Sequence, residues 1–355
     1  MQKYLHNTLK LLLVAVFVVL LYVSGVLIIN SALNYKPETK NLDITGQEKT
    51  SYISGHNTFS ILSWNIGYAG LGSNSDFFYD GGKMVRPARE NYELYKKGIL
   101  ECIQAFDSLD FILFQEIDTA SARSYGINQY AEISGCTPAH SNVFAKNYDV
   151  AYVPVPVFRP MSKVISGLAV FSQFSISSAI QVVFPENYSW PTRLFMPDRC
   201  FILTIFDLPS GRKLHIINTH NSAFDDGSLR ISQLRLLYEY MQSAYQAGDY
   251  VVAGGDWNIN PEGYSNSLFL SRDPAFSVPD MLPASPPDST WAIAFDPDYP
   301  TSRDVSAPYA LGLTPTTIID YFMCSPNIKV LDVRTLYDSF KFSDHQPVYL
   351  RFELL

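Results

Sequence analysis

The sequence is poor in cysteine and in charge, and each shortage excludes a class of protein. Its 355 residues include four cysteines, Cys102, Cys136, Cys200 and Cys324, none of them close to another. This spacing excludes a zinc site built on paired thiolates and argues against a disulfide framework. Charged residues make up only 17% of the chain, too few for a disordered chain or a coiled coil.

Basic residues are also scarce. Lys and Arg number 26 against 34 Asp and Glu, so the formal net charge is −8. This balance argues against a broad basic surface for nucleic acid, although it leaves room for a local patch. Apolar residues make up 47% of the chain and aromatic residues 14%, which supplies a large buried core. The composition is typical of β-rich or α/β proteins of one or two domains.

One segment lacks charge altogether. No charged residue lies between Lys10 and Lys36, and residues 11–29 read LLLVAVFVVLLYVSGVLII. About twenty such residues, rising about 1.5 Å each in a helix, cross the roughly 30 Å hydrocarbon core of a bilayer. We therefore predict a transmembrane signal anchor over residues 11–29. Because Lys3 and Lys10 precede it and no cation follows closely, we expect residues 1–10 to be cytoplasmic and the bulk of the chain extracytoplasmic.

Cleavage of this segment is the alternative. A signal peptide carries a similar apolar run, and its removal would give a secreted protein. The run is long and no clear small-x-small site follows it, which favours a single-pass membrane protein. Two basic residues and no acidic ones precede residue 36, so the remainder carries a net charge of −10. The exported part is therefore distinctly acidic.

The rest of the chain has no internal repeat and no low-complexity tract. Residues 30–57 are polar and without periodicity, as in a linker, and one domain over residues 58–355 is the simplest partition. Short apolar runs predict eight buried strands. They cover residues 59–66, 110–117, 167–174, 200–208, 213–220, 250–257, 317–324 and 347–354.

Two amphipathic helices are predicted between these strands, one beginning after Pro87 and one over residues 228–247. Strands outnumber helices and alternate with them only in part. The pattern favours an α/β fold of two packed sheets flanked by helices over a doubly wound parallel sheet. Two stretches, residues 67–86 and the proline-rich residues 271–316, are predicted to be loops that shape a substrate site.

Polar side chains recur where the predicted strands end. They are Asn65, Glu116, His220, Asp256 with Asn258, Asp320, and Asp344 with His345. Each one alone has a structural explanation, such as shaping a turn. Their recurrence at strand ends indicates a common cleft, because ligands gather outside such ends in sheet proteins.

These residue types favour one kind of chemistry. Carboxylates, carboxamides and imidazoles, without a thiol or a G-x-S-x-G serine, suit a hard divalent cation and phosphate oxygens, and zinc less well. His345 directly follows Asp344 and lies 24 residues beyond Asp320. One carboxylate can hold a metal while the other pairs with the imidazole, which fixes its tautomer and raises its basicity.

The ordered series of motifs resembles the endonuclease/exonuclease/phosphatase superfamily, whose members include pancreatic deoxyribonuclease, abasic-site endonucleases, neutral sphingomyelinases and inositol polyphosphate 5-phosphatases. The series reads WN65, QE116, NTH220, GD256WN258, ID320Y and SD344H345. It extends from Phe59 to Leu354 and covers nearly the whole exported part. The resemblance implies a four-layered α/β/β/α sandwich of two packed mixed sheets and magnesium-dependent hydrolysis of a phosphoester.

The resemblance also assigns a metal site. Glu116 corresponds to the principal ligand, Asn65 lies beside it, and Asp344 completes or bridges the site. The expected ion is Mg²⁺, with Mn²⁺ as a substitute, because Mg²⁺ prefers oxygen ligands.

The catalytic roles follow in the same way. His345 matches the general base and Asp320 the carboxylate that orients it. Asp256 and Asn258 match the pair that positions the attacking water and holds phosphate oxygens. His220 matches the histidine that stabilises the developing charge or assists the leaving group.

The predicted protein is thus a membrane-anchored, Mg²⁺-dependent phosphodiesterase or phosphatase with no implied protein partner. The anchor and the acidic surface favour a phospholipid headgroup as substrate, as in a sphingomyelinase. An extracytoplasmic endonuclease or exonuclease acting on DNA or RNA is the alternative. A non-catalytic binding module is a third hypothesis, disfavoured because the strongest motif positions are all present.

Several residues outside the motifs have two interpretations. Arg89, Arg193 and Arg199 can contact phosphate, although an isolated arginine is more often a surface ion-pair partner. Tyr188 and Trp190 can present an aromatic tip to lipid or to a base, but a surface turn packed onto the core is the commoner arrangement.

Overall fold

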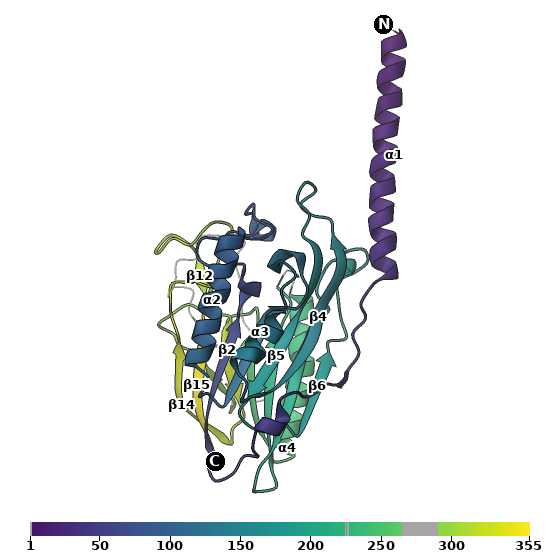
Figure 1. Ribbon diagram of the computed structural model, residues 1–355. Coiled ribbons are helices and arrows are strands. Elements are labelled where there is room, and N and C mark those ends of the chain that lie inside the picture. The colour runs from purple at the N-terminus through teal and green to yellow at the C-terminus, as the bar shows by residue number, and fades with distance from the viewer. Residues whose placement is uncertain (1, 224, 226, 265–289) are drawn as a thin grey trace.

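A long helix, α1 (Gln2–Ala32), stands out from a body of sheets and helices (Figure 1). The structure is a computed structural model that describes residues 2–223, 225, 227–264 and 290–355. Within these residues, α1 is the one helix long and apolar enough to cross a membrane. It contains the predicted span at residues 11–29. A helix of this kind serves either as an anchor or as a signal sequence.

Two packed sheets form the body. The first has the order β1-β6-β7-β8-β9-β13-β10 and the second has the order β14-β15-β2-β3-β5-β4. The strands of the first sheet are β1 (Lys40–Asn41), β6 (Ser178–Val183), β7 (Cys200–Asp207), β8 (Lys213–His220), β9 (Tyr250–Asp256), β13 (Asp320–Cys324) and β10 (Ala292–Ala294). Those of the second are β14 (Ile328–Thr335), β15 (Val348–Leu354), β2 (Thr58–Asn65), β3 (Phe111–Asp118), β5 (Ser162–Ser172) and β4 (Ser141–Val153). A small separate pair is formed by β11 (Ser302–Arg303) and β12 (Thr316–Thr317).

Helices cover both outer faces, which confirms the predicted four-layered sandwich. On the second sheet, α2 (Arg89–Ala105) and α3 (Gln129–Cys136) pack over β2 and β3. On the first sheet, α4 (Ser228–Gln246) packs over β9 and its neighbours. Both predicted helices form with the predicted apolar face inward, because burying each large side chain contributes about 1.5–3 kcal/mol. The buried face of α2 includes Tyr92, Tyr95, Ile99 and Ile103.

The core between the two sheets consists of apolar side chains from both inner faces. Phe111 and Leu113 of the second sheet pack with Ile216 and Val252 of the first, and all four are fully buried. This tight contact holds the sheets in one relative position. Residues from both sheets therefore form a single site at one end of the sandwich.

Strand direction determines which end that is. The pairs β2–β3 and β8–β9 are parallel, so Asn65 lies next to Gln115 and His220 next to Asp256 at one edge. One expectation was wrong in detail: Asp320 begins β13 instead of ending a strand, and a break at residues 318–319 divides the predicted strand 317–324. Because β13 runs antiparallel to β9, its start lies at the same edge and pairs with Asp256.

Asp344 and His345 depart from the expectation in the same way. They lie in the loop that precedes β15 and do not end a strand. This loop reaches the site because β15 is antiparallel to β2. The strand's first residues therefore lie beside the last residues of β2.

Segments predicted to be irregular carry some regular structure. Residues 40–41, within the predicted linker 30–57, add a short edge strand to β6, and Ile53 is buried in the core. The loop 67–86 contains two single-turn helices, η2 (Gly67–Ala69) and η3 (Phe78–Asp80). Of the predicted loop 271–316, residues 271–289 lie outside the described part of the chain.

Candidate active site

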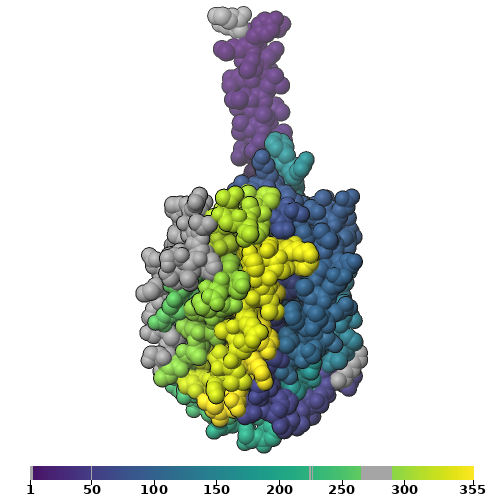
Figure 2. Space-filling view, turned by 90° about the vertical axis from the view of Figure 1, so that its left-hand side faces the viewer, coloured from purple at the N-terminus to yellow at the C-terminus, as the bar shows by residue number. Residues whose placement is uncertain are grey.

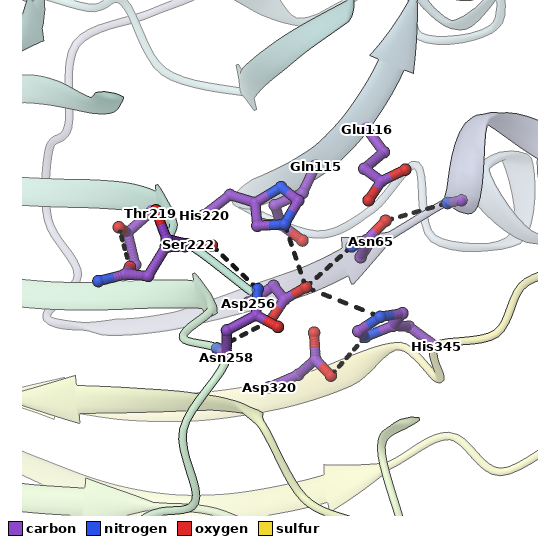
Figure 3. A network of polar contacts seen from close by, with 12 residues as sticks. Asn65, Gln115, Glu116, Thr219, His220, Ser222, Asp256, Asn258, Asp320 and His345 are labelled. Atoms are coloured by element: carbon purple, nitrogen blue, oxygen red, sulfur yellow. Dashed lines mark hydrogen bonds and ion pairs between the residues drawn. The ribbon is translucent and has the colours of Figure 1, made fainter. Parts of the chain in front are cut away.

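A cavity of about 900 Å³ opens where the two sheets present these strand ends. Six of the eight predicted site residues line it: Glu116, His220, Asp256, Asn258, Asp344 and His345. The other two, Asn65 and Asp320, lie directly behind and hydrogen-bond to lining residues. Side chains from both sheets thus converge on one space (Figure 3).

His345 and Asp320 form a buried pair. Nδ1 of the imidazole lies 2.8 Å from Oδ2 of Asp320, and the indole Nε1 of Trp64 donates to the His345 carbonyl oxygen at 3.0 Å. Burial alone would lower the pKa of His345, but the carboxylates of Asp320 and Asp256 outweigh it and raise that pKa well above the ordinary value. A neutral His345 donates its Nδ1 proton to Asp320 and so presents a basic Nε2 to the cavity.

Asp256 is the centre of the polar network. Its Oδ2 accepts a hydrogen bond from Nδ2 of Asn65 at 3.0 Å and lies 3.4 Å from Nε2 of His220 and 3.7 Å from Nε2 of His345. Its Oδ1 accepts from the backbone N–H of Asn258 at 3.0 Å. Burial raises the pKa of Asp256 to about 6. One carboxylate therefore joins four of the predicted residues.

His220 and Asn258 complete the wall beside Asp256. Burial, reinforced by the positive charges of Arg199 and His345, lowers the pKa of His220 well below its ordinary value. His220 is therefore neutral and can donate a hydrogen bond. The side-chain Nδ2 of Asn258 donates to the carbonyl oxygen of Asn221 at 3.0 Å. This bond holds the side chain in place, and the backbone of Asn258 has φ +51°.

Glu116 and Asp344 both line the cavity. Glu116 has φ +55° at a bulge in β3, an irregularity that turns its side chain out of the strand's ordinary alternation. The pKa of Asp344 is raised by burial and further by Glu116, although His345 opposes the shift. Burial and then the charge of Asp344 raise the pKa of Asp80 on η3 to about 7. Crowded acidic oxygens of this kind fit a hard divalent cation, because a cation relieves their mutual repulsion.

Asn65 is engaged on both of its amide atoms. Its Nδ2 donates to Asp256, and its Oδ1 accepts from the backbone N–H of Gly67 at 3.0 Å. The oxygen keeps a second lone pair for a metal ion. Asn65 therefore fits both the predicted ligand set and a positioning role for Asp256.

Four arginines line the cavity, Arg123, Arg199, Arg230 and Arg303. Of these, only Arg199 was a candidate from the sequence. Arg123 makes a two-pronged ion pair with Asp118, at 3.1 and 3.0 Å, and its guanidinium lies 3.9 Å from Glu116. The guanidinium of Arg199 has no hydrogen bond or ion pair within the described residues. Arg89, in contrast, pairs with Glu93 on the surface at 2.6 Å.

A further buried pair behind the site was also not predicted. Gln115 donates to Oδ1 of Asn218 across the two sheets at 2.7 Å, and Asn218 donates to the carbonyl oxygens of Phe114 and Ala169 at 2.9 Å each. Because buried amides are costly to leave unpaired, these bonds fix the distance between the sheets at the base of the cavity.

Comparison with models of protein families agrees with the family resemblance seen in the sequence. The model of the Endonuclease/Exonuclease/phosphatase family matches residues 62–345. The chain belongs to the Endonuclease/Exonuclease/phosphatase family. Members of this family are hydrolases that act on phosphoester bonds and commonly use divalent metal ions. The described residues also include a buried group, Asp256, Asp320 and His345, whose possible ligand atoms lie within 4.8 Å of one another. This group differs from the predicted ligands Glu116, Asn65 and Asp344, and within it His345 is already hydrogen-bonded to Asp320.

Solved structures of this family share the fold. An endonuclease/exonuclease/phosphatase from Beutenbergia cavernae DSM 12333 is 18% identical, with a TM-score of 0.52 over 84% of this chain and 72% of that one. ANGEL2, a 2',3'-cyclic phosphatase, is 17% identical, with a TM-score of 0.54 over 88% and 98%. TDP2 from D. rerio, complexed with single-strand DNA product, is 14% identical, with a TM-score of 0.51 over 83% and 99%. A search of curated proteins gives no match.

Proposed function

We propose that this family member is a membrane-anchored, Mg²⁺-dependent phosphoester hydrolase in which His345 activates a water molecule. The observation that carries the proposal is the buried His345–Asp320 pair, which presents a basic nitrogen to the same cavity that Glu116 and Asp344 line. A base and an acidic ion site at one phosphate-sized position are what metal-assisted hydrolysis requires.

Each residue of the site has its own role in this proposed reaction. Glu116 and Asp344, with Asn65 behind them, would hold the ion, which supplies Lewis-acid polarisation of the phosphate when bound. Nε2 of His345 takes the proton of the attacking water, and Asp320 stabilises the imidazolium that results. Asp256 and the Asn258 amide orient that water from the other side.

Three donors are placed to stabilise negative charge on phosphate oxygens. His220 is neutral and offers a proton from its ring, while Arg123 and Arg199 offer guanidinium groups on the cavity wall. Arg123 is already held by Asp118, so its position is fixed before substrate binds. Arg199 is unengaged within the described part of the chain, which suits a residue that pairs with substrate.

We further propose a phospholipid headgroup as the substrate. The cavity combines these polar groups with apolar lining side chains, and α1 would act as an anchor that keeps the domain at a lipid surface. The apolar lining includes Leu71, Phe77, Met161, Tyr188 and Met196. The acidic exported part disfavours a long polyanion. Hydrolysis of DNA or RNA is the second candidate, favoured by the fold shared with TDP2 bound to single-strand DNA product.

A substrate panel tests this proposal. Full-length protein reconstituted in vesicles is assayed against sphingomyelin, phosphatidylinositol species, DNA, RNA and a soluble phosphodiester, with Mg²⁺, Mn²⁺ or excess chelator. We expect lipid headgroup release that needs the metal. Glu116→Gln should lower turnover by about a hundredfold or more, while Glu101→Gln, an exposed carboxylate on α2, should not.

Two other outcomes of the substrate panel would contradict the proposal. Cleavage of DNA or RNA without lipid turnover would replace the lipid proposal by the nuclease alternative. No turnover of any substrate, including the soluble phosphodiester, would reject the hydrolase and revive the binding module.

A further inference from the structure

The connection between β4 and β5, residues 154–161, ends in a cluster of exposed apolar side chains, which we name the hairpin tip. Phe158 is 97% exposed, Val157 is 67% exposed, and Val155 is also exposed. A soluble domain rarely places a fully exposed phenylalanine beside two exposed valines unless that surface meets a partner. The tip is therefore a candidate interaction surface.

The charge around the tip differs from that of the rest of the molecule. The exported part carries a net charge of −10, yet no Asp or Glu occurs from Val150 to Pro185. The charged side chains in and next to the tip are Arg159 and Lys163, both exposed. Apolar side chains flanked by cations fit the interface of a bilayer that contains anionic lipids.

The position of the tip beside α1 points to the same partner. Asn30 of α1 donates to the backbone carbonyl of Tyr152 at 3.0 Å and accepts from its N–H at 3.2 Å, and the hydroxyl of Tyr152 lies 3.2 Å from that of Tyr22. Tyr152 is thus level with the end of the predicted span at residues 11–29. Beyond Tyr152, the tip continues alongside α1 toward the N-terminus (Figures 1 and 2).

We infer that the hairpin tip inserts into the membrane interface beside α1, so that the catalytic cavity opens toward the lipid headgroups. This inference rests on the proposed anchoring by α1. If α1 spans the bilayer, the tip lies at or below the headgroup level, where exposed Phe158 and Val157 bury apolar surface and Arg159 meets lipid phosphate.

The wall of the cavity links this contact to the site. Met161, the last residue of the tip, is buried and lines the cavity. The segment around η5 (Thr192–Leu194) packs against α1, and its neighbours Tyr188 and Met196 line the cavity as well. Trp190, in the same segment, is 57% exposed. The tip and this segment thus connect the membrane side of the domain to the place where a phosphoester would bind.

Depth-dependent quenching tests the insertion directly and needs no activity. The full chain carrying Phe158→Trp is reconstituted in vesicles of phosphatidylcholine and phosphatidylglycerol, with or without brominated acyl chains. Emission is compared with that of the parental chain, because its four tryptophans, including the exposed Trp190, contribute a background. The matched control is Tyr52→Trp, an aromatic residue that is 70% exposed near η1 (Gln47–Lys49), at the end of the body away from α1.

We expect brominated lipid to quench the added emission of Phe158→Trp and to leave that of Tyr52→Trp unchanged. Equal quenching in the two variants would overturn the inference, as would a tip that is quenched only by a water-soluble agent. The latter result would show that the tip lies in water.

A second arm tests the consequence for substrate delivery. Val157→Asp with Phe158→Asp places two charges where apolar groups are buried in lipid, so turnover of a vesicle lipid should fall by about tenfold or more. Turnover of the soluble phosphodiester should stay within about twofold, because neither residue lines the cavity. An equal loss on both substrates, or on neither, would contradict the inference. Failure of the hydrolase itself would show as absent turnover of the soluble substrate, while quenching of Phe158→Trp would still report insertion.

Discussion

His220 and His345 lie on either side of one carboxylate, and their surroundings move their pKa values in opposite directions. His345 faces Asp320 and Asp256, which raise its pKa, while His220 is buried near Arg199 and its pKa falls. The first is suited to accept a proton and the second to donate a hydrogen bond while neutral. Two chemically identical side chains thus have different roles because their neighbours differ.

The pH dependence of kcat/KM tests the role of Asp320. A general base must be neutral, so activity should fall as pH drops through the raised pKa of His345, above the ordinary imidazole value. Asp320→Asn removes one cause of that raised pKa. The acidic limb of the profile should therefore move to lower pH, with a reduced plateau. An unchanged limb in this variant would show that another group is the base.

Arg199 should contribute to substrate binding and little to folding. Its guanidinium makes no hydrogen bond or ion pair within the described residues, and burial lowers its pKa although Glu116 and Asp256 oppose the shift. Arg199→Ala therefore breaks no direct contact and should change the melting temperature little. We expect kcat/KM to fall about tenfold or more, because one charged contact to phosphate contributes roughly 1.5–3 kcal/mol. Arg193→Ala, an exposed neighbour, is the control. Equal effects of the two substitutions on kcat/KM would contradict this role.

The sequence allowed the main side chains of the site to be predicted, but not their supports. Asp320, Asp344 and His345 could be identified because each lies in a short motif, and these motifs follow one another in the order found in the superfamily. Arg123 could not, since its role depends on a contact with Asp118 and on the path of a loop. The Gln115–Asn218 hydrogen bond could not be predicted for a similar reason. It joins two sheets, and no local sequence pattern indicates which residues face each other across them.

Gly255, in β9, determines through the backbone how close the neighbouring Asp256 lies to β8. It has φ +145°, and a Cβ built there would lie 2.0 Å from the carbonyl oxygen of Thr219 in β8. Gly255→Ala should therefore separate the two strands and lower the free energy of unfolding by roughly 1–3 kcal/mol or more. Circular dichroism melting measures this loss.

A second glycine gives the control for that substitution. Gly135 in α3 has no atom within 4 Å of an added Cβ. Gly135→Ala should raise stability by roughly 0.5–1 kcal/mol, because alanine is the better helix former. If Gly255→Ala were as stable as the parental protein, β8 and β9 would have space for a Cβ at residue 255, which would contradict the prediction.

Helices were easier to predict than strands. The helices at 89–105 and 228–246 have a clear apolar face, so periodicity alone located them. The longest strand, β4, was not predicted, because Lys146, Asn147 and Asp149 interrupt its apolar pattern. The structure shows how this is accommodated: β4 is an edge strand with two register shifts, Lys146 and Asp149 are half-buried and pair with each other, and Asn147 is buried.

Divalent metal should stabilise the whole molecule. Glu116, Asp344 and Asp80 crowd the cavity with acidic groups, and an ion that binds only the folded state adds about 2.7 kcal/mol at a hundred times its dissociation constant. Thermal unfolding in Mg²⁺ and in chelator measures this effect. The combined variant Glu116→Gln and Asp344→Asn should lose it. A metal-induced shift that survives in this variant would place the ion elsewhere.

The helix α1, the hairpin tip and the cavity lie at one end of the molecule. The C-terminus, at the end of β15, lies at the other end (Figure 1). The first residues of β15 lie beside the last residues of β2, so the cavity lies at the end of the sandwich opposite the C-terminus. This is the end nearest α1 (Figure 1). Under the proposed anchoring by α1, this arrangement would bring the cavity close to substrates that lie in or on the membrane.

The most direct test of the account is the rate of Mg²⁺-dependent hydrolysis of a soluble phosphodiester by the full chain and by His345→Ala. Removal of a general base should lower kcat by about 10²–10⁴-fold, with the fold and the metal-induced stabilisation retained. A variant that keeps the parental rate, or a parental rate that excess chelator leaves unchanged, would contradict it.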